Sequence, residues 1–148
     1  MNCHDPDSLY SVFSQVIRFH YYRTHMLLEK VGVYPGQPPL LFIIGKHDGI
    51  SQKDLAEKLH IKAATITVML RRMEKAKLVE RRADSDDQRV SRAYLTKEGK
   101  KVNTEAKVAL KAIDQECFSN FTVEEQLLLR RLLMQMRDNL AQLCEKSI

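Results

Sequence analysis

Residues 51–99 decide the fold, and they read SQKDLAEKLHIKAATITVMLRRMEKAKLVERRADSDDQRVSRAYLTKEG. Ser51 is followed three residues later by Asp54, a variant of the capping box that predicts the start of a short amphipathic helix. After a turn at residues 60–61, apolar residues recur at three-to-four spacing and predict a second helix over residues 62–76. The segment therefore predicts two consecutive helices joined by a tight turn.

The spacing of the apolar residues changes after the second predicted helix. Residues 78–82 and 90–95 have the pattern of two short strands, and the polar residues 83–88 predict the loop that joins them. Thr96 follows as a candidate cap of a further helix. A hairpin directly after the second helix predicts the winged form of the helix-turn-helix motif, whose loop can reach a minor groove of DNA with an arginine.

Helical patterns continue on both sides of this segment. Asp5-Pro6 predicts the cap and opening of a helix that ends near Gly32, and residues 40–46 predict a short buried helix after a loop rich in Pro and Gly. Two long helices are expected, one over residues 96–117 and one that opens at a second capping box at residues 122–125.

The length of 148 residues fits one domain. We expect a mainly α fold with a small β-hairpin wing over residues 1–148, in which residues 36–97 form a winged helix-turn-helix and residues 5–33 and 98–146 form dimerisation helices. The apolar stripes of the flanking helices are wider than a winged module of about 55 residues can cover, which predicts a homodimer. The alternative is an intramolecular helical bundle.

Composition excludes several classes of protein. No apolar run approaches the roughly 20 residues that span a bilayer, and no secretory signal is evident, so we expect a cytoplasmic protein with no membrane partner. The three cysteines form no C-x-x-C pair, and the histidines match no zinc spacing, so no disulfide framework, metal or cofactor is expected. None of the common catalytic or nucleotide-binding motifs occurs, which argues against an enzyme.

The basic excess of the chain lies in its middle. The formal net charge is +5, but residues 45–101 contain 15 basic and 9 acidic side chains. The outward face of the second helix combines small and hydroxyl residues with arginines, which suits close approach to the major groove of double-stranded DNA. The alternative is that these are solvated polar residues on a core helix.

Four motifs then resemble one known family, and they occur in its order: Gln52-Lys-Asp-Leu-Ala56-Glu-Lys-Leu59, Thr65-Ile-Thr67, Leu78-Val79-Glu-Arg81, and Asp87-Gln-Arg89 followed by Leu95-Thr96-Lys-Glu-Gly99. This set is similar to the MarR family of winged-helix transcription regulators, over essentially the whole chain. The resemblance implies a regulator, usually a repressor, in which Arg89 enters the minor groove and Asp87 holds that arginine or a neighbouring one by an ion pair. The candidate DNA-binding residues are Gln52, Lys62, Ala63, Thr65, Thr67, Val68, Arg71, Arg72, Arg81, Asp87 and Arg89. A two-fold dimer would place two recognition helices about 34 Å apart, on a palindromic site.

Aromatic and cationic residues between the first helix and the predicted DNA-binding part could bind a small aromatic anion, an effector class that the resemblance implies. The candidates are Phe19, His20, Tyr21, Arg23 and Phe42. The alternative is that they are ordinary core and interface residues.

Two other functions stay open. Cys3 would be the sensor of a thiol-based redox regulator, although it precedes the first predicted helix, and Cys117 is expected to pack on an apolar stripe. The second alternative is a winged-helix module that contacts proteins and does not bind DNA.

Overall fold

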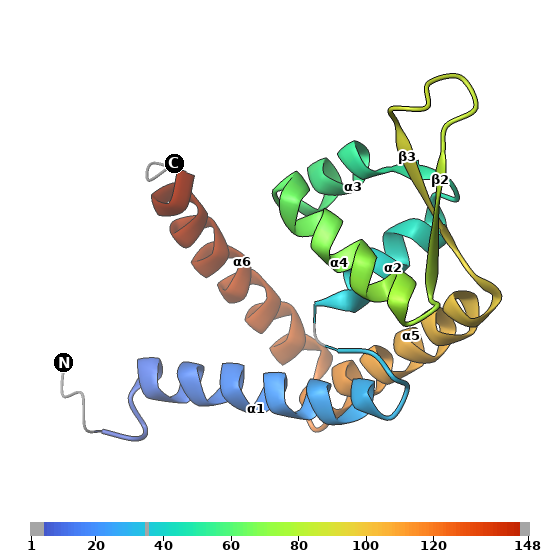
Figure 1. Cartoon of the computed structure of the whole chain (residues 1–148). Helices are drawn as coiled ribbons and strands as arrows, with labels where there is room; N and C mark the ends of the chain where they lie inside the picture. Colours follow the sequence, from blue (N-terminus) through green and yellow to red (C-terminus); the bar gives the residue numbers. More distant parts are fainter. Residues whose placement is uncertain (1–4, 35, 146–148) are drawn as a thin grey trace. The chain divides into compact units, whose positions relative to one another are not determined.

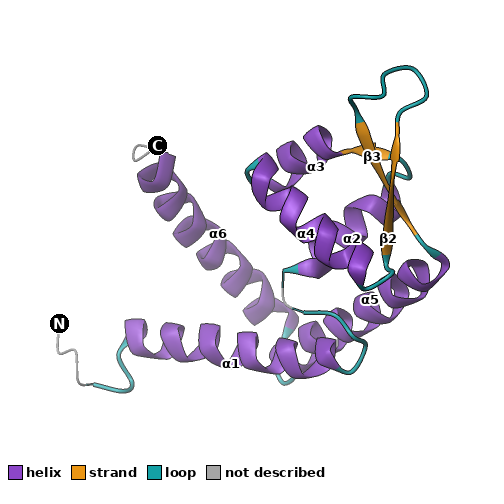
Figure 2. Cartoon of the chain, in the orientation of Figure 1, coloured by secondary structure: helices purple, strands orange, loops and turns teal. Residues whose placement is uncertain are grey.

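The computed structural model describes residues 5–34 and 36–145, and in these residues it contains six α-helices and three short strands (Figures 1 and 2). By its contacts the chain divides after Ile113 into two compact units, with Asp114 as the first residue of the second. The fold is the winged helix-turn-helix that the sequence predicts, mainly helical with a small sheet.

The first helix, α1 (Leu9–Glu29), begins later than predicted. Ser8 is its N-cap, and the Ser8 hydroxyl accepts a hydrogen bond from the Ser11 N–H at 3.3 Å. Asp5 instead closes the preceding turn by accepting from the Asp7 N–H at 2.9 Å. The prediction that Asp5-Pro6 opens the helix is therefore wrong, because the serine hydroxyl supplies the cap that the helix uses.

Helix α2 (Gln37–Lys46) begins three residues before the predicted start. Pro38 and Pro39 lie in its first turn, where the N–H that proline lacks would have no partner within the helix. The prolines assigned to a loop thus open the helix, and Leu40, Leu41 and Ile44 of α2 are fully buried.

The helix-turn-helix is formed by α3 (Gln52–Leu59) and α4 (Ala63–Lys75), and its first cap agrees with the prediction. The Ser51 hydroxyl accepts from the Asp54 N–H at 3.1 Å and donates to the Asp54 carboxylate at 2.8 Å. His60 follows α3 in the left-handed conformation, with φ of 52°, and this reverses the chain before α4.

The wing is an antiparallel hairpin of β2 (Val79–Ala83) and β3 (Ser91–Leu95), within one residue of the predicted strands. A third strand, β1 (Ile50–Ser51), was not predicted; it pairs with β3 and gives the sheet order β1-β3-β2. Two residues are too few to show alternation, so no periodic signal could identify this strand.

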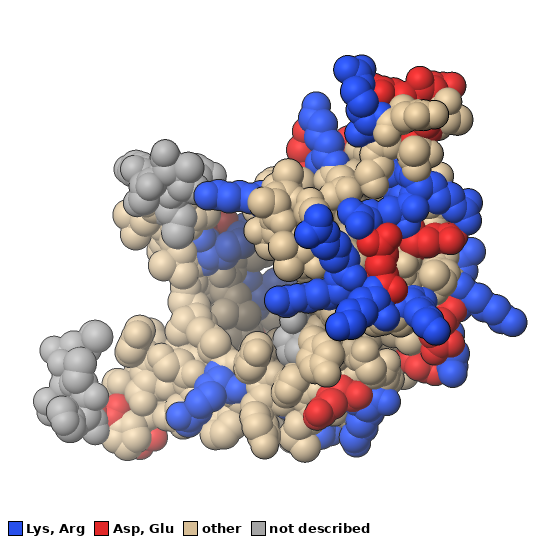
Figure 3. Space-filling view, in the orientation of Figure 1, with Lys and Arg blue, Asp and Glu red and all other residues tan. Residues whose placement is uncertain are grey.

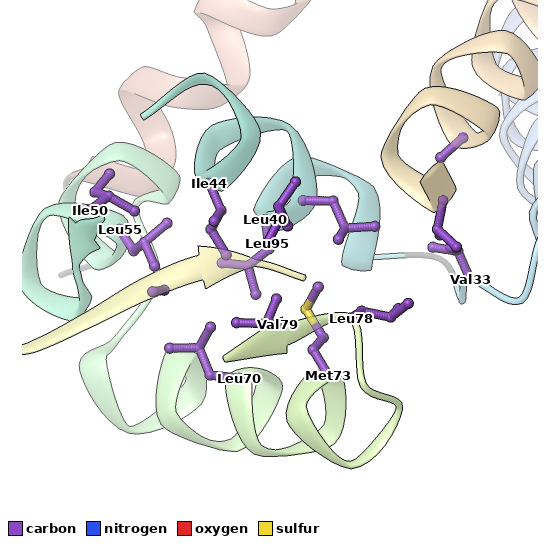
Figure 4. Packing of buried hydrophobic residues seen from close by; sticks show 14 of the residues in the cluster. Val33, Leu40, Ile44, Ile50, Leu55, Leu70, Met73, Leu78, Val79 and Leu95 are labelled. Atoms are coloured by element: carbon purple, nitrogen blue, oxygen red, sulfur yellow. The ribbon is translucent and has the colours of Figure 1, made fainter. Parts of the chain in front are cut away.

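One hydrophobic core joins the helix-turn-helix to the wing, the end of α1 and the first half of α5 (Lys97–Cys117). Figure 4 shows its side chains converging from α2, α3, α4 and the strands. The fully buried members include Leu28, Leu40, Leu41, Ile44, Leu55, Ile66, Leu70 and Met73. The packing of Ile66, Leu70 and Met73 confirms the predicted inner face of the second helix of the motif.

The second unit contains the end of α5 and helix α6 (Val123–Glu145). The predicted capping box opens α6: the Thr122 hydroxyl accepts from the Glu125 N–H at 3.2 Å, and the Glu125 carboxylate accepts from the Thr122 N–H at 2.8 Å. Cys117, expected to pack on an apolar stripe, is exposed at the end of α5. The prediction does not hold within the single chain, because the last buried residue of α5 is Ile113, four residues before Cys117.

Candidate nucleic-acid interface

Helix α4 has one face in the core and one face in solvent. Six of the predicted DNA-binding residues are exposed on this helix or just before it: Lys62, Ala63, Thr65, Val68, Arg71 and Arg72. Small side chains near the start of the helix allow a backbone to approach closely, and the arginines extend the reach of the same element. The inner face anchors the helix, so this outer face is presented on a rigid support.

Three other predicted DNA-binding residues, all partly exposed, are joined to one another by hydrogen bonds. The Gln52 amide nitrogen donates to the Thr67 hydroxyl at 3.1 Å, and the Thr67 hydroxyl donates to the Ala63 carbonyl at 3.0 Å. The Arg81 guanidinium contacts the Gln52 amide oxygen at 3.5 Å and forms an ion pair with Glu74 at 2.7 Å. The Arg81 side chain is only 25% exposed, so its charge is directed at Glu74 instead of into solvent.

The wing loop between β2 and β3 is organised by two aspartates. Asp84 accepts hydrogen bonds from the backbone N–H groups of Asp86 and Asp87, at 2.9 and 3.0 Å, and pairs with Arg92. The Arg92 guanidinium also donates to the Gly49 carbonyl at 2.9 Å. Arg92 therefore ties the wing to the turn that precedes β1. Neither Asp84 nor Arg92 was among the predicted site residues, because their only signal in the sequence was their charge.

Asp87 and Arg89 form the ion pair that is one of the two expected arrangements for this motif. The Arg89 Nε and Nη2 donate to the two Asp87 carboxylate oxygens at 3.0 and 3.1 Å. This bonding lowers the pKa of Asp87 and raises the pKa of Arg89. The Arg89 side chain is 90% exposed, so the pair lies at the tip of the wing in open solvent.

Charge on this face of the molecule is unevenly distributed. Figure 3 shows Lys and Arg side chains gathered over α4 and along the wing, while acidic side chains cluster with them at the wing tip. A groove of DNA would therefore meet basic side chains along α4 and paired charges at the wing.

The pH response of the wing follows from Asp84. The Arg92 hydrogen bond, together with the two backbone N–H groups, lowers the pKa of Asp84 from 3.8 to about 2. A lowered native pKa contributes stability above the unfolded pKa, and this contribution is lost as the pH falls from about 4 through about 2. In Arg92→Gln the pKa of Asp84 should rise toward 3.8, as measured by carboxyl-carbon NMR titration.

Arg89→Gln is the matched control for Arg92→Gln. It should raise the pKa of Asp87 and leave the pKa of Asp84 unchanged. If the pKa of Asp84 stayed the same in Arg92→Gln, Arg92 would not be the group that lowers it.

The candidate ligand-binding residues do not converge in one chain. Phe19 and Tyr21 lie on α1 and are 60% and 62% exposed. Two positions along a helix are about 200° apart, so these two rings leave opposite sides of α1. Phe42 instead is partly buried and packs against the core of the first unit, with the Lys107 ammonium nitrogen 5.7 Å from the centre of its ring. These residues therefore do not come together within the described single chain, and their role in ligand binding stays a prediction.

A different aromatic group does assemble at the end of α1. The His25 ring lies 6.4 Å from the rings of both Tyr21 and Tyr34. The buried His25 Nδ1 and Thr24 hydroxyl have no hydrogen-bond partner among the described residues. The other two predicted ligand-binding residues also lie on α1, where Arg23 is half-buried and His20 is exposed.

The remaining predictions from the sequence concern a cysteine, metals and membranes. Cys3 lies outside the residues that the structure describes. Residues 5–34 and 36–145 contain no group of three or more metal-binding side chains. Nor does any helix in the described ranges have the length and apolar character needed to cross a membrane.

Comparisons with known proteins agree with this architecture. A family model described as the MarR family matches residues 33–91. The chain is 31% identical over 109 residues to the HTH-type transcriptional regulator YdgJ of Bacillus subtilis, and 34% identical over 100 residues to the HTH-type transcriptional repressor MdtR of the same organism. These matches cover 74% and 68% of this chain and 66% and 64% of the relatives, just under two thirds of their length.

A solved structure shares the fold over most of both chains. The crystal structure of a MepR–DNA complex from S. aureus superposes with a TM-score of 0.78 at 23% identity, and it covers 89% of this chain and 98% of that chain. At 23% identity this similarity supports a shared fold and nothing further.

Proposed function

The chain belongs to the MarR family of winged helix-turn-helix transcription regulators, and from this premise we propose that it binds double-stranded DNA as a sequence-specific regulator, most simply a repressor. The observation that carries the proposal is the outer face of α4, where small, hydroxyl and arginine side chains stand free on a helix whose other face is buried. Further support comes from the name of the relative MdtR, a repressor, and from the neighbour in fold crystallised with DNA.

Binding to duplex DNA tests this proposal against a protein-contact module. Anisotropy of a labelled random duplex at low salt should show binding that weakens linearly with the logarithm of the salt concentration, because basic side chains displace counterions from phosphates. An absence of salt-dependent binding by the folded protein would reject the proposal.

Arg89 is proposed to read the minor groove from the wing. Arg89→Ala should weaken operator binding by about 1 to 3 kcal/mol and flatten the preference for A·T-rich flanks, because a narrow minor groove attracts a guanidinium. The melting temperature should change little, since the side chain is 90% exposed and its ion pair with Asp87 lies in solvent. Affinities for operators with A·T-rich and G·C-rich flanks give the measurement.

Arg137→Ala on α6 is the matched control for Arg89→Ala. It also removes an exposed arginine paired with a neighbouring aspartate, here Asp138, and should leave the flank preference intact. If Arg89→Ala behaved like this control, recognition would rest on α4 without the wing.

A homodimer that reads a palindromic operator is the second element of the proposal. On α1 the large apolar side chains exposed in the chain include Leu9, Val12, Val16 and Ile17, and on α6 they include Leu127, Leu128, Leu132, Leu133 and Leu140. Apolar surface on this scale is characteristic of an interface. Two copies related by a two-fold axis would place their α4 helices about 34 Å apart on successive turns of DNA.

We also propose release by a small aromatic anion. The Tyr21, His25 and Tyr34 rings, with the two unpartnered polar atoms beside them, are the supporting observation. Binding must be reciprocal, so bound operator should weaken the binding of the anion by the factor by which the anion weakens operator binding. Calorimetry with a panel of aromatic carboxylates tests this, and a lack of heat with the free protein would leave these residues as packing.

A further inference from the structure

Arg81 stands where three elements of the motif meet. It lies on β2, and its guanidinium contacts Glu74 of α4 and Gln52 of α3. Its Nε donates to Glu74 Oε2 at 2.9 Å and its Nη2 forms the ion pair with the same oxygen at 2.7 Å, while Nη1 lies beside the Gln52 amide oxygen at 3.5 Å. Both charged side chains are at most 30% exposed, so this pair is shielded from solvent more than the Arg89–Asp87 pair at the wing tip.

This arrangement determines which way the Gln52 amide points. An amide has an acceptor end and a donor end, whereas a guanidinium only donates. The Gln52 oxygen is therefore favoured on the side of Arg81, and the NH₂ group is directed at the Thr67 hydroxyl, 3.1 Å away. A flipped amide would place two donors against each other.

The orientation of the amide in turn fixes whether the Thr67 hydroxyl acts as a donor or an acceptor. That hydroxyl receives a hydrogen bond from Gln52 and gives its own proton to the Ala63 carbonyl at 3.0 Å. A hydroxyl has one proton and two lone pairs, so only one lone pair is left for a ligand. Thr67 can therefore accept a hydrogen bond from a base, or make a methyl contact, but it cannot donate.

We propose that Arg81, held by Glu74, is a positioning residue that sets the hydrogen-bond polarity of Thr67 on the recognition helix, so that Thr67 selects a base edge carrying a donor and disfavours guanine. In the major groove the donors are the amino groups of adenine and cytosine, while guanine presents only acceptors. This proposal rests on the proposed DNA-binding function and assigns Arg81 and Gln52 an indirect role in place of direct DNA contact.

Selection from a library of randomised duplexes, sequenced before and after binding, tests the proposal at each operator position. Thr67→Val keeps the shape of the side chain and removes the hydroxyl, and it should relax the preference at one base pair of each half-site by about fivefold, the worth of one ordinary hydrogen bond. Arg81→Met should weaken the base preference at the same position by a similar factor. The double variant should add nothing to either single change, because the three residues act in one chain of hydrogen bonds.

Two controls separate positioning from other roles. Arg81→Met should keep the salt dependence of the native protein, whereas the exposed Arg72→Met should lower the salt slope by about one if it meets a phosphate. Gln52→Leu leaves the Arg81–Glu74 ion pair intact and should weaken the base preference at the same position. It therefore serves as the test if Arg81→Met fails to fold.

Several results would overturn the proposal. A uniform loss of affinity with a lower salt slope in Arg81→Met would make Arg81 a phosphate contact. Unchanged base preference in folded Arg81→Met or Gln52→Leu would reduce the network to a structural role. If the native protein instead shows no salt-dependent binding to any duplex, the proposed function itself fails. If the native protein selects a base pair and the variants keep the same selectivity, only the positioning role of Arg81 fails.

Discussion

Replacing Gly99 with alanine is expected to lower the free energy of unfolding by about 3 kcal/mol or more. A Cβ at this position would lie 1.9 Å from the Leu78 carbonyl oxygen and 2.9 Å from the Leu78 carbonyl carbon. These are backbone atoms of the residue just before β2, and the same carbonyl accepts a hydrogen bond from the Thr96 N–H at 3.1 Å. Relief therefore requires the start of α5 to move away from the sheet. Thermal and denaturant unfolding measure the loss.

Lys100→Ala is the matched control for Gly99→Ala, since it changes the next, exposed residue of the same helix. It should alter stability by no more than about 0.5 kcal/mol. The direction of the Gly99 effect is itself informative, because glycine to alanine in an unobstructed helix stabilises by about 1 kcal/mol. A Gly99→Ala protein as stable as the native one would show that α5 does not pack on Leu78 as described.

Charging Leu140 is expected to dissociate the proposed dimer and to weaken operator binding in the same variant. Leu140 lies on α6 and is 55% exposed in the single chain, so glutamate costs little in the monomer and much in an apolar interface. Loss of the linked second half-site should reduce operator affinity by about 10² to 10⁴-fold. Light scattering should give 17.2 kDa for Leu140→Glu, and about twice that mass is expected for the native dimer.

Gln135→Glu introduces the same charge at another exposed position of α6 and serves as the control. It should preserve both the dimer and the affinity. Native affinity in a Leu140→Glu protein shown to be monomeric would contradict the two-half-site model, and a native protein of 17.2 kDa at micromolar concentration would remove the dimer from the proposal.

Much of the candidate interface was predictable because its signals are short. The buried side of α4 followed from its three-to-four spacing, and the exposed side followed as its complement. The motif at Leu95-Thr96 and Gly99 also has a local reason. The Thr96 hydroxyl accepts from the Gly99 N–H at 2.9 Å and donates to the Lys77 carbonyl at 2.6 Å, so the motif caps α5 and joins it to the start of the wing.

Other parts of the interface could not be predicted, because their partners lie far apart in sequence. Arg81 was expected to contact DNA, yet its partner Gln52 is 29 residues away. Arg92 was not singled out at all, although it joins the wing to Gly49, 43 residues earlier. A charged side chain has the same appearance in a sequence whether it faces a phosphate or an internal carboxylate.

The sequence by itself determined the helices, their caps and the order of the elements, since these depend on residues no more than four positions apart: a hydroxyl and the N–H three residues on, or apolar side chains that meet on one face of a helix. Only the tertiary structure decided that Ile50 and Ser51 form a strand, that Cys117 is exposed and that the Thr67 hydroxyl receives a hydrogen bond from the Gln52 amide. Each of these depends on a neighbour brought close, or left absent, by packing of the whole chain. Such a neighbour leaves no periodic mark in the sequence, because its place is set by the core that α2, α3, α4 and the sheet form together.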